Sequence, residues 1–419
     1  MNPVKCGVRA AGIVLTLLTL ASTPVRGESA EVIYEWNRLV QSVSPNWRAY
    51  AIMHIAMFDA VNSVADVYTP FRIHVPGARG ASQQVAAAQA AHDVLVSLFP
   101  AQSASFGAAL ARSQVGIPFG LAEQGKAIGR QVAQEVLKWR QEDGWPATIT
   151  PDGNHPLPPF PGLYQRTPPA NSAPTFTFYR NATPFGILSS TQFLPPSPPA
   201  ITSVQYAKDF NETKLLGAVN SGARTPEQTL LAQIAHGVNT STGPFKVWNN
   251  VTGAVARSRA LSLVDAARLF ALLNVSFNDA IQTSMTSKFV YNLWRPVTAI
   301  RLADQDLNHA TEADPNWLPL LPTPPYPAYA GNMSCLSFAS ARALSLVFGR
   351  DDIPLSVTWE RTMGLPNETR EFTGFSDLAE QMARSRVHGG IHFQFDTEAS
   401  RQVCGKIADY VNSNFMRPR

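Results

Sequence analysis

Residues 385–396 read Ser-Arg-Val-His-Gly-Gly-Ile-His-Phe-Gln-Phe-Asp, which combines a cation, two imidazoles and a carboxylate around a glycine pair. The glycine pair indicates a turn, and the spacing of His392 and Asp396 predicts that they share one helix face. Asp396 would then orient the His392 imidazole and leave its other ring nitrogen free as a ligand or a nucleophile. The alternative is a core histidine whose hydrogen bond to Asp396 has only a structural role.

A second charged segment, Lys288-Phe-Val-Tyr-Asn-Leu-Trp-Arg295-Pro296, separates a lysine and an arginine by seven positions. Seven residues are about two helical turns, so we expect Lys288 and Arg295 on one helix face, within reach of a common anion. Pro296 is expected to perturb the helix just after the arginine. Two solvated cations on a surface helix are the simpler interpretation of this segment taken alone.

The third segment is a proline-rich loop, Pro324-Pro-Tyr-Pro-Ala-Tyr-Ala-Gly331-Asn332-Met333, which runs into a stretch of small residues with helical character. A loop that ends in glycine and opens a helix presents free backbone N–H groups, which suit an anion. Taken alone this pattern is not specific, because many helices begin in the same way.

In this order, the three segments resemble the vanadium-dependent haloperoxidase and type 2 phosphatidic acid phosphatase superfamily, and above all its haloperoxidase-like branch. That family carries Lys-x6-Arg-Pro, then Pro-Ser-Gly-His, then Ser-Arg-x5-His-x3-Asp, and the first and third motifs match here in full. Supporting likeness extends to residues 47–62, 294–301 and 317–329. The resemblance therefore covers most of the chain after residue 27, apart from its proline-rich middle.

The resemblance implies a mainly α-helical fold of two bundles with proline-rich connecting loops. We expect an N-terminal bundle in residues 28–200, with a proline-rich excursion over about 146–200, and a C-terminal bundle in residues 201–419 that carries the oxyanion site. The residue pattern agrees with a mainly α class, because apolar residues recur at helical spacing in most long segments and strand-like alternation is scarce.

The resemblance also implies roles for the polar residues. Lys288, Arg295 and Arg386 would bind the oxygens of a tetrahedral oxyanion, either vanadate or phosphate, because guanidinium groups stay charged and bind oxygens in pairs. His392 would ligate vanadium or attack phosphorus, and Asp396 would hold His392. Hydrogen peroxide would be the cosubstrate if the chemistry is oxidative.

The middle motif departs from the family pattern. The family's Ser-Gly-His falls on Gly331, Asn332 and Met333, so both the hydroxyl that bonds the oxyanion and the imidazole that moves protons in relatives are missing. A thioether has no proton to give, and loss of a general acid typically removes ~10²–10⁴ in rate. We expect Gly331 and Asn332 to be part of the oxyanion-binding site, where the Asn332 side-chain amide would replace part of the lost hydrogen bonding. A site that releases hypohalous acid would also oxidise an accessible Met333 to its sulfoxide.

His388 is a second imidazole in the first segment and a candidate stand-in for the missing proton donor. A His-x3-His-x3-Asp zinc site can also be drawn through His388, His392 and Asp396. The glycine pair argues against one regular helix through all three, and no further ligand is evident in the sequence. A surface histidine is the plainer alternative.

Three functions remain open. The first is a diverged haloperoxidase-like enzyme of secondary metabolism that binds vanadate or phosphate and oxidises a small organic molecule, with weak or altered halogenating activity. The second is phosphatase, diphosphate-cleaving or cyclising chemistry in the same pocket, because a diphosphate leaves as a stable anion and needs no acid. The third is a non-catalytic family member that binds an anion only. Gly331 and Met333 favour the second and third, and the likeness around Trp294 and Phe393 favours the first.

The first 27 residues have the pattern of a secretory signal peptide. Lys5 and Arg9 precede a largely apolar run over residues 10–21, and small residues follow, with cleavage expected after Gly27. This run is shorter than the roughly 20 residues that a membrane span needs. We therefore expect a secreted or periplasmic protein without a membrane span. An uncleaved anchor is the alternative.

Charge and cysteine content narrow the partners. Three of the 34 basic residues lie before residue 28 and no acid does, which leaves 31 basic against 30 acidic residues and no general attraction to nucleic acid. A small molecule is the expected partner, and a homo-oligomer is left open. Three cysteines exclude a disulfide-framework protein. An oxidising compartment would permit Cys335 and Cys404 to pair, but their separation in space does not follow from the sequence.

Overall fold

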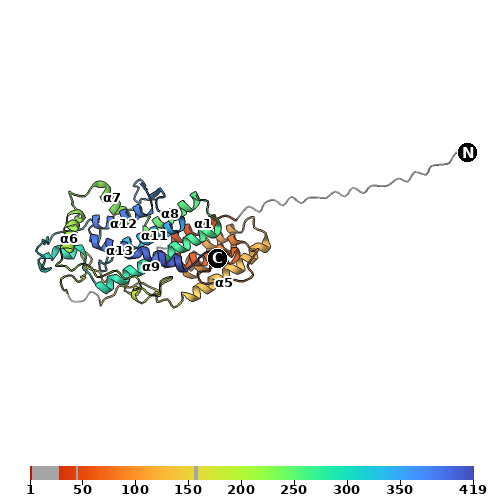
Figure 1. Ribbon diagram of the computed structural model, residues 1–419, viewed down its shortest axis with the longest axis horizontal. Helices are drawn as coiled ribbons and strands as arrows, with labels where there is room; N and C mark the ends of the chain where they lie inside the picture. Colours follow the sequence, from red (N-terminus) through yellow and green to blue (C-terminus); the bar gives the residue numbers. More distant parts are fainter. Residues whose placement is uncertain (2–27, 44–45, 155–158) are drawn as a thin grey trace.

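The computed structural model describes residues 1, 28–43, 46–154 and 159–419. Within these ranges the fold is mainly α-helical, as predicted, with thirteen α-helices and one two-stranded sheet (Figure 1). The predicted signal peptide lies outside the described residues. Among the helices of the described ranges, none is long and apolar enough to cross a membrane.

The helices and strands follow one another along the chain without repetition of a simple unit. The α-helices are α1 (Glu31–Val43), α2 (Trp47–Ala65), α3 (Gln83–Leu98), α4 (Ser103–Ser113), α5 (Phe119–Trp139), α6 (Val204–Gly217), α7 (Pro226–His236), α8 (Pro244–Ser258), α9 (Leu263–Tyr291), α10 (Pro296–Arg301), α11 (Asn332–Phe348), α12 (Phe375–His388) and α13 (Gln394–Asn414). The 3-10 helices and the strands are η1 (Pro100–Gln102), η2 (Thr177–Arg180), η3 (Ala303–Gln305), β1 (Leu355–Trp359) and β2 (Glu368–Phe372).

Several helices begin at a side chain that caps their free N–H groups. Ser82, Ser203 and Ser262 each accept a hydrogen bond from the backbone N–H three residues further on, at the starts of α3, α6 and α9. At the start of α7, Thr225 and Gln228 form a capping box. Local sequence therefore determines where these helices begin.

Helix α9 forms the centre of the core. Every residue from 269 to 289 is buried, and α9 packs against α2, α11 and α13. In Figure 1 the early helices, coloured orange, gather at one end of the molecule and α6 lies at the other, with α9, α11 and α13 between them. The main hydrophobic cluster includes residues of α2 and of α9, so the two halves of the chain share a core. A domain boundary at about residue 200 remains a prediction.

Two buried aspartates hold loops against the core in the same way. Asp59 on α2 accepts hydrogen bonds from three consecutive backbone N–H groups, at residues 71–73. Asp279 on α9 accepts three more, from residues 185–187 in the proline-rich middle of the chain. Because hydrogen bonds to a carboxylate are stronger than neutral ones, each aspartate fixes the path of its loop over the bundle.

Two of the differences from the sequence expectation concern a helix boundary and a pair of strands. Apolar residues recur at helical spacing over residues 254–277, which predicts one helix, but the chain is divided there into α8 and α9 because Ala260 adopts a left-handed φ of 49° and Ser262 caps a new helix. The strands β1 and β2 form an antiparallel hairpin that the sequence analysis did not predict. Residues of β1 alternate between buried and exposed, but over only five positions.

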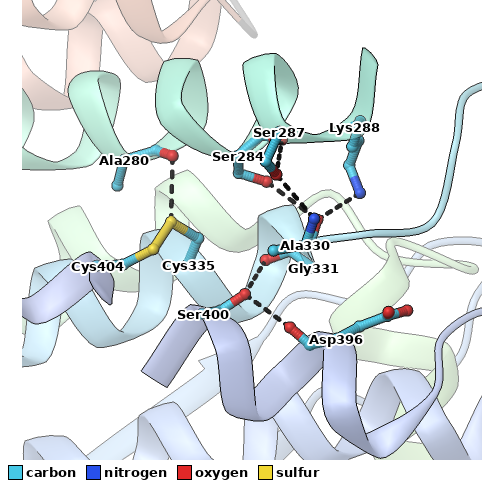
Figure 2. The surroundings of a disulfide bond; sticks show 10 residues. All are labelled: Ala280, Ser284, Ser287, Lys288, Ala330, Gly331, Cys335, Asp396, Ser400 and Cys404. Atoms are coloured by element: carbon cyan, nitrogen blue, oxygen red, sulfur yellow. Dashed lines mark hydrogen bonds between the residues drawn. A yellow bond between two sulfur atoms is a disulfide. The ribbon is translucent and has the colours of Figure 1, made fainter. Parts of the chain in front are cut away.

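Cys335 on α11 and Cys404 on α13 form a disulfide, with their Cα atoms 5.2 Å apart (Figure 2). The Cys335 sulfur also lies 3.2 Å from the carbonyl oxygen of Ala280 on α9. A disulfide sulfur carries no proton, so this approach is a packing contact. The disulfide decides the pairing that the sequence left open, and it joins two of the helices that carry the candidate site.

Candidate oxyanion-binding site

Lys288 and Arg295 lie on opposite sides of the break between α9 and α10. Lys288 is in the last turn of α9, which ends where Asn292 takes up a left-handed φ of 50°. Arg295 precedes α10 in extended backbone, and Pro296 is the first residue of that helix. One helix through both cations was predicted and is not found, because Asn292 ends α9 before Arg295. Both side chains are nevertheless fully buried in the same region.

Lys288 ties the end of α9 to the proline-rich loop before α11. Its Nζ donates hydrogen bonds to the carbonyl oxygens of Ala328 and Ala330, both at 2.6 Å, and the Ala330 N–H donates to Ser287 Oγ (Figure 2). Burial and the nearby charge of Arg295 lower the pKa of Lys288 well below its ordinary value. An anion close to Lys288 would restore that pKa and stabilise the charged form.

Arg295 connects this loop to His392. Its Nε donates to the carbonyl oxygen of Tyr326 at 2.7 Å, and its Nη1 donates to that of Ile391 at 2.7 Å. The same Nη1 lies 3.1 Å from His392 Nε2. Because a guanidinium can only donate, His392 Nε2 is the acceptor in this contact and carries a lone pair. Burial and the charges of Arg295 and Lys288 lower the pKa of His392, which keeps the imidazole neutral.

Asp396 fixes the other side of the imidazole. His392 Nδ1 donates to Asp396 Oδ2 at 2.8 Å, and the Phe393 N–H donates to the same oxygen at 3.1 Å. His392 lies in the loop between α12 and α13, and Asp396 lies in the first turn of α13. The pair therefore spans a helix start, not one helix face as predicted, because the turn at residues 389–390 ends α12. Burial raises the pKa of Asp396, and the charge of Lys288 opposes this shift.

The glycine pair holds the His392 loop against neighbouring backbone. Gly390 has a left-handed φ of 73°, and a Cβ there would lie 2.4 Å from the carbonyl oxygen of Gly217 at the end of α6. A Cβ on Gly389 would lie 2.4 Å from Leu321 Cδ1. Neither position has room for a side chain, so α6 and the loop that carries His392 are in direct contact.

Arg386 contacts two residues of α7, which therefore borders the site. Its Nη2 donates to the carbonyl oxygen of Ala232 at 3.0 Å, and its Nη1 lies 3.3 Å from His236 Nδ1. Burial and the charge of Arg386 lower the pKa of His236 to about 3. The sequence analysis missed His236, which ends an ordinary amphipathic helix and lies 150 positions before Arg386 in the chain. No local pattern connects the two residues.

The site has more positive charges than negative charges, and some of its hydrogen-bond donors have no acceptor among its own residues. Among the described residues, Arg295 Nη2 and Arg386 Nε are buried without a hydrogen-bond partner. Burial lowers the pKa of His392, and the positive charges of both arginines and of Lys288 lower it further. Burial also lowers the pKa of Lys288 and of Arg295, and Asp396 is the acid whose negative charge opposes that shift. Buried charges are costly unless they are compensated. Free guanidinium donors beside a histidine lone pair therefore fit a tetrahedral oxyanion such as vanadate or phosphate.

A cavity of about 200 Å³ opens beside these groups. Arg386, His392, His236, Asn332 and Met333 lie in its wall. The Asn332 side chain also hydrogen-bonds Tyr326, another residue of this wall. The cavity thus connects the buried cations with a space large enough for a small molecule.

Not every predicted residue lines the cavity. Lys288 and Arg295 lie behind its wall, where Arg295 contacts Nε2 of His392 directly. Gly331 is the N-cap of α11, and its N–H donates to the carbonyl oxygen of Asp396 at 3.2 Å. An oxyanion at His392 would replace the contact between Arg295 and the imidazole, and the Gly331 N–H is already used within the fold.

His388 ends α12 outside the cavity wall. Its carbonyl oxygen accepts a hydrogen bond from Arg224 Nη1 at 3.2 Å, and its own Nδ1 is buried without a hydrogen-bond partner among the described residues. Burial and the charge of Arg384 lower the pKa of His388 to about 4. No group of three or more His, Cys, Asp or Glu residues in the described part of the chain is placed to hold a metal ion. The zinc arrangement drawn through His388 therefore does not form there.

Comparisons with known proteins show which proteins this chain resembles. The family model of the VCPO second helical-bundle domain matches residues 268–418. The vanadium chloroperoxidase of Curvularia inaequalis is 23% identical over 328 residues, which cover 64% of this chain and 52% of that protein. The chain thus spans about half the length of this curated relative.

Two solved structures share the fold over nearly the whole chain. A bacterial vanadium-dependent iodoperoxidase superposes with a TM-score of 0.75 at 22% identity, covering 94% of this chain and 99% of that one. A holo-type bacterial vanadium-dependent chloroperoxidase gives a TM-score of 0.68 at 15% identity, covering 93% of each chain. At these identities the two structures establish the fold and not the activity. The matches in sequence and in fold therefore agree that this chain is similar to vanadium haloperoxidases.

Proposed function

We propose that this protein is an enzyme that binds vanadate and uses hydrogen peroxide to oxidise a small organic molecule. The observation that carries the proposal is that Arg295 contacts His392 Nε2, while Arg295 Nη2 and Arg386 Nε are, among the described residues, buried without a hydrogen-bond partner. When bound, vanadate supplies a Lewis-acidic centre that activates peroxide. The similarity to vanadium haloperoxidases supports this choice of oxyanion.

In this proposal each residue has a definite task. His392 Nε2 is the ligand atom, and Asp396 keeps the proton on Nδ1 so that the lone pair stays available. Arg295, Arg386 and Lys288 bind the oxyanion oxygens and stabilise negative charge that grows on them.

Proton transfer in this site falls to His236 in our proposal. Met333 has no proton to give, whereas His236 lines the same cavity as His392 and contacts Arg386. Burial is the main reason why the pKa of His236 is low, and the charge of Arg386 lowers it further, so an anion bound at Arg386 would raise that pKa. Replacement His236→Gln is expected to change the pH profile of turnover more than His388→Gln does. A larger effect at His388 would return the role to that residue.

Phosphoryl or diphosphate chemistry is the second candidate, and the thioether of Met333 in the cavity wall favours it. His392 Nε2 has the lone pair that a nucleophile needs, and the arginines would hold the departing group. A diphosphate leaves as a stable anion, so it requires no acid at position 333. Anion binding without turnover of either kind would identify the third alternative, a non-catalytic family member.

The first test uses protein purified without phosphate, with vanadate added, and measures the oxidation of bromide by hydrogen peroxide. We expect activity in the wild type, none in His392→Ala, and wild-type activity in the control His309→Ala, because His309 is an exposed histidine. No detectable bromide oxidation by the wild type would contradict the oxidative proposal.

If the wild type does not oxidise bromide, the double replacement Met333→His with Gly331→Ser shows whether the fold still supports vanadate-dependent oxidation. A Cβ on Gly331 would lie 3.1 Å from Ser334 Oγ, so this hydroxyl has to move slightly to admit the new side chain. Activity restored by this pair would mean that the site has been turned to other chemistry. Phosphate and diphosphate esters are then the substrates to assay.

Export of the mature chain remains a proposal. The disulfide between Cys335 and Cys404 supports it, because structural disulfides persist in oxidising compartments. Mass spectrometry of the protein recovered from a native host is expected to show an N-terminus at Glu28. A full-length chain recovered from the reducing cytoplasm would contradict export.

A further inference from the structure

Much of the cavity wall is apolar. Its apolar residues come from four helices: Trp47 of α2, Phe245 of α8, Phe277 and Ile281 of α9, and Met333 and Leu336 of α11. Arg386, His236 and His392 belong to the same wall. A molecule in the cavity therefore meets both an apolar surface and the candidate oxyanion residues.

Trp47 is held in place by an aromatic cluster. Its ring stacks on Tyr179 with ring centres 6.4 Å apart and meets the edge of Trp145. Its indole N–H donates to the Tyr179 hydroxyl, so this donor is already used. Trp47 consequently offers the cavity a fixed ring surface and no free hydrogen-bond donor.

The volume sets the size of the occupant. An apolar cavity of about 150 Å³ in another protein binds benzene. The present cavity of about 200 Å³ is large enough for one ring with a small substituent. A fused bicyclic or polycyclic molecule exceeds this volume.

Met333, in the unusual middle motif, contributes an apolar surface to the cavity wall. It occupies the position where the related motif carries histidine, it is 8% exposed, and it lines the cavity. A thioether is polarisable and contacts aromatic rings favourably, whereas an imidazole in the same place would require a polar partner. The substitution that removes a proton donor therefore creates an apolar wall beside the oxyanion site.

We propose that this cavity binds a single-ring aromatic substrate, with Met333 as a binding residue. The inference rests on the proposed function in one respect, since the bound ring is the molecule presented to the oxyanion site. Recognition of the ring itself needs neither vanadate nor peroxide, because it depends on the apolar wall.

The test is a titration of the protein with fluorobenzene followed by ¹⁹F NMR, in phosphate buffer without vanadate or peroxide. We expect saturable binding to the wild type and to Met333→Leu, which keeps the wall apolar at similar volume. Met333→Gln has a similar length but places an amide against the ring, so we expect about tenfold weaker binding. Equal affinity of Met333→Gln and wild type, or no saturable binding to the wild type, would overturn the inference.

A second measurement needs no variant. The wild type is expected to bind 1-fluoronaphthalene at least about tenfold more weakly than fluorobenzene, because a second ring does not fit the cavity. Equal affinity for the two probes would refute the single-ring assignment.

These outcomes are independent of the proposed function. Fluorobenzene binding without peroxide-dependent oxidation would overturn the oxidative function and leave the aromatic site standing. Bromide oxidation without fluorobenzene binding would overturn the aromatic site and leave the oxidative function standing.

Discussion

Replacing Arg295 by lysine tests the oxyanion site most directly. Arg295 uses Nε and Nη1 to bond two carbonyl oxygens, and within the described part of the chain its Nη2 is buried without a hydrogen-bond partner. Lysine keeps the positive charge, but its donors sit on one tetrahedral nitrogen, so it cannot place them where Nε, Nη1 and Nη2 of the planar guanidinium lie. The variant therefore separates the geometry of the donors from the charge of the site.

The expected loss follows from the missing donor. A hydrogen bond to a charged group contributes about 1.5–3 kcal/mol, and 1.4 kcal/mol is a factor of ten in affinity. Arg295→Lys is thus expected to bind phosphate or vanadate about 10- to 150-fold more weakly than the wild type. A carbonyl oxygen left without its donor also costs about 1–3 kcal/mol, so the variant is expected to be less stable without ligand.

Isothermal titration calorimetry with phosphate, and separately with vanadate, measures this affinity without relying on the melting temperature. The matched control is Arg342→Lys, because Arg342 lies on α11, is about half exposed and pairs with Asp409 at 2.7 Å. The control is expected to keep the wild-type Kd for both anions. A Kd of Arg295→Lys within twofold of the wild type would refute direct contact between Arg295 and the anion.

Three further predictions concern stability and the shape of the site. Serine at both Cys335 and Cys404 removes a cross-link between positions 69 residues apart, which should lower the free energy of unfolding in urea by about 4 kcal/mol; an unchanged value would refute this. Burial lowers the pKa of His54 to about 3, so below pH 6.5 the unfolded chain takes up a proton that the folded chain does not. Stability should therefore fall as the pH drops from 6.5 toward 3, and His54→Gln should remove about 1.4 kcal/mol of that fall per pH unit, as measured by urea unfolding at each pH. Gly390→Ala forces a Cβ to within 2.4 Å of the Gly217 carbonyl oxygen, so phosphate should bind about tenfold more weakly by calorimetry while circular dichroism stays helical; wild-type affinity would argue against the contact.

The helical class and the charged residues of the site were accessible from sequence, because period and motif are local properties. Lys288, Arg295 and His392 lie together as the ordered motifs implied, although the chain turns between the first two. Helix ends were less accessible. Apolar periodicity continues across Ala260, and the left-handed residue there leaves no mark in that pattern.

His236 shows the other limit of sequence reasoning. Its contact with Arg386 arises because α7 packs against α12, and this packing is decided by the whole bundle and not by either segment. The hairpin of β1 and β2 was missed for a related reason, since pairing across the turn and not the composition of each short strand stabilises it.

The link between α11 and α13 has a consequence for ligand recognition. Beyond the disulfide, Ser400 Oγ lies 2.9 Å from the carbonyl oxygens of both Gly331 and Asp396, at the first turns of these two helices (Figure 2). The cross-link and the serine together hold these turns in one arrangement before any ligand arrives. The site is in this sense preorganised, and the entropy of ordering it is lost when the protein folds and not when it binds. In the proposed function, affinity for an oxyanion would then reflect mainly its contacts with the arginines and the histidine.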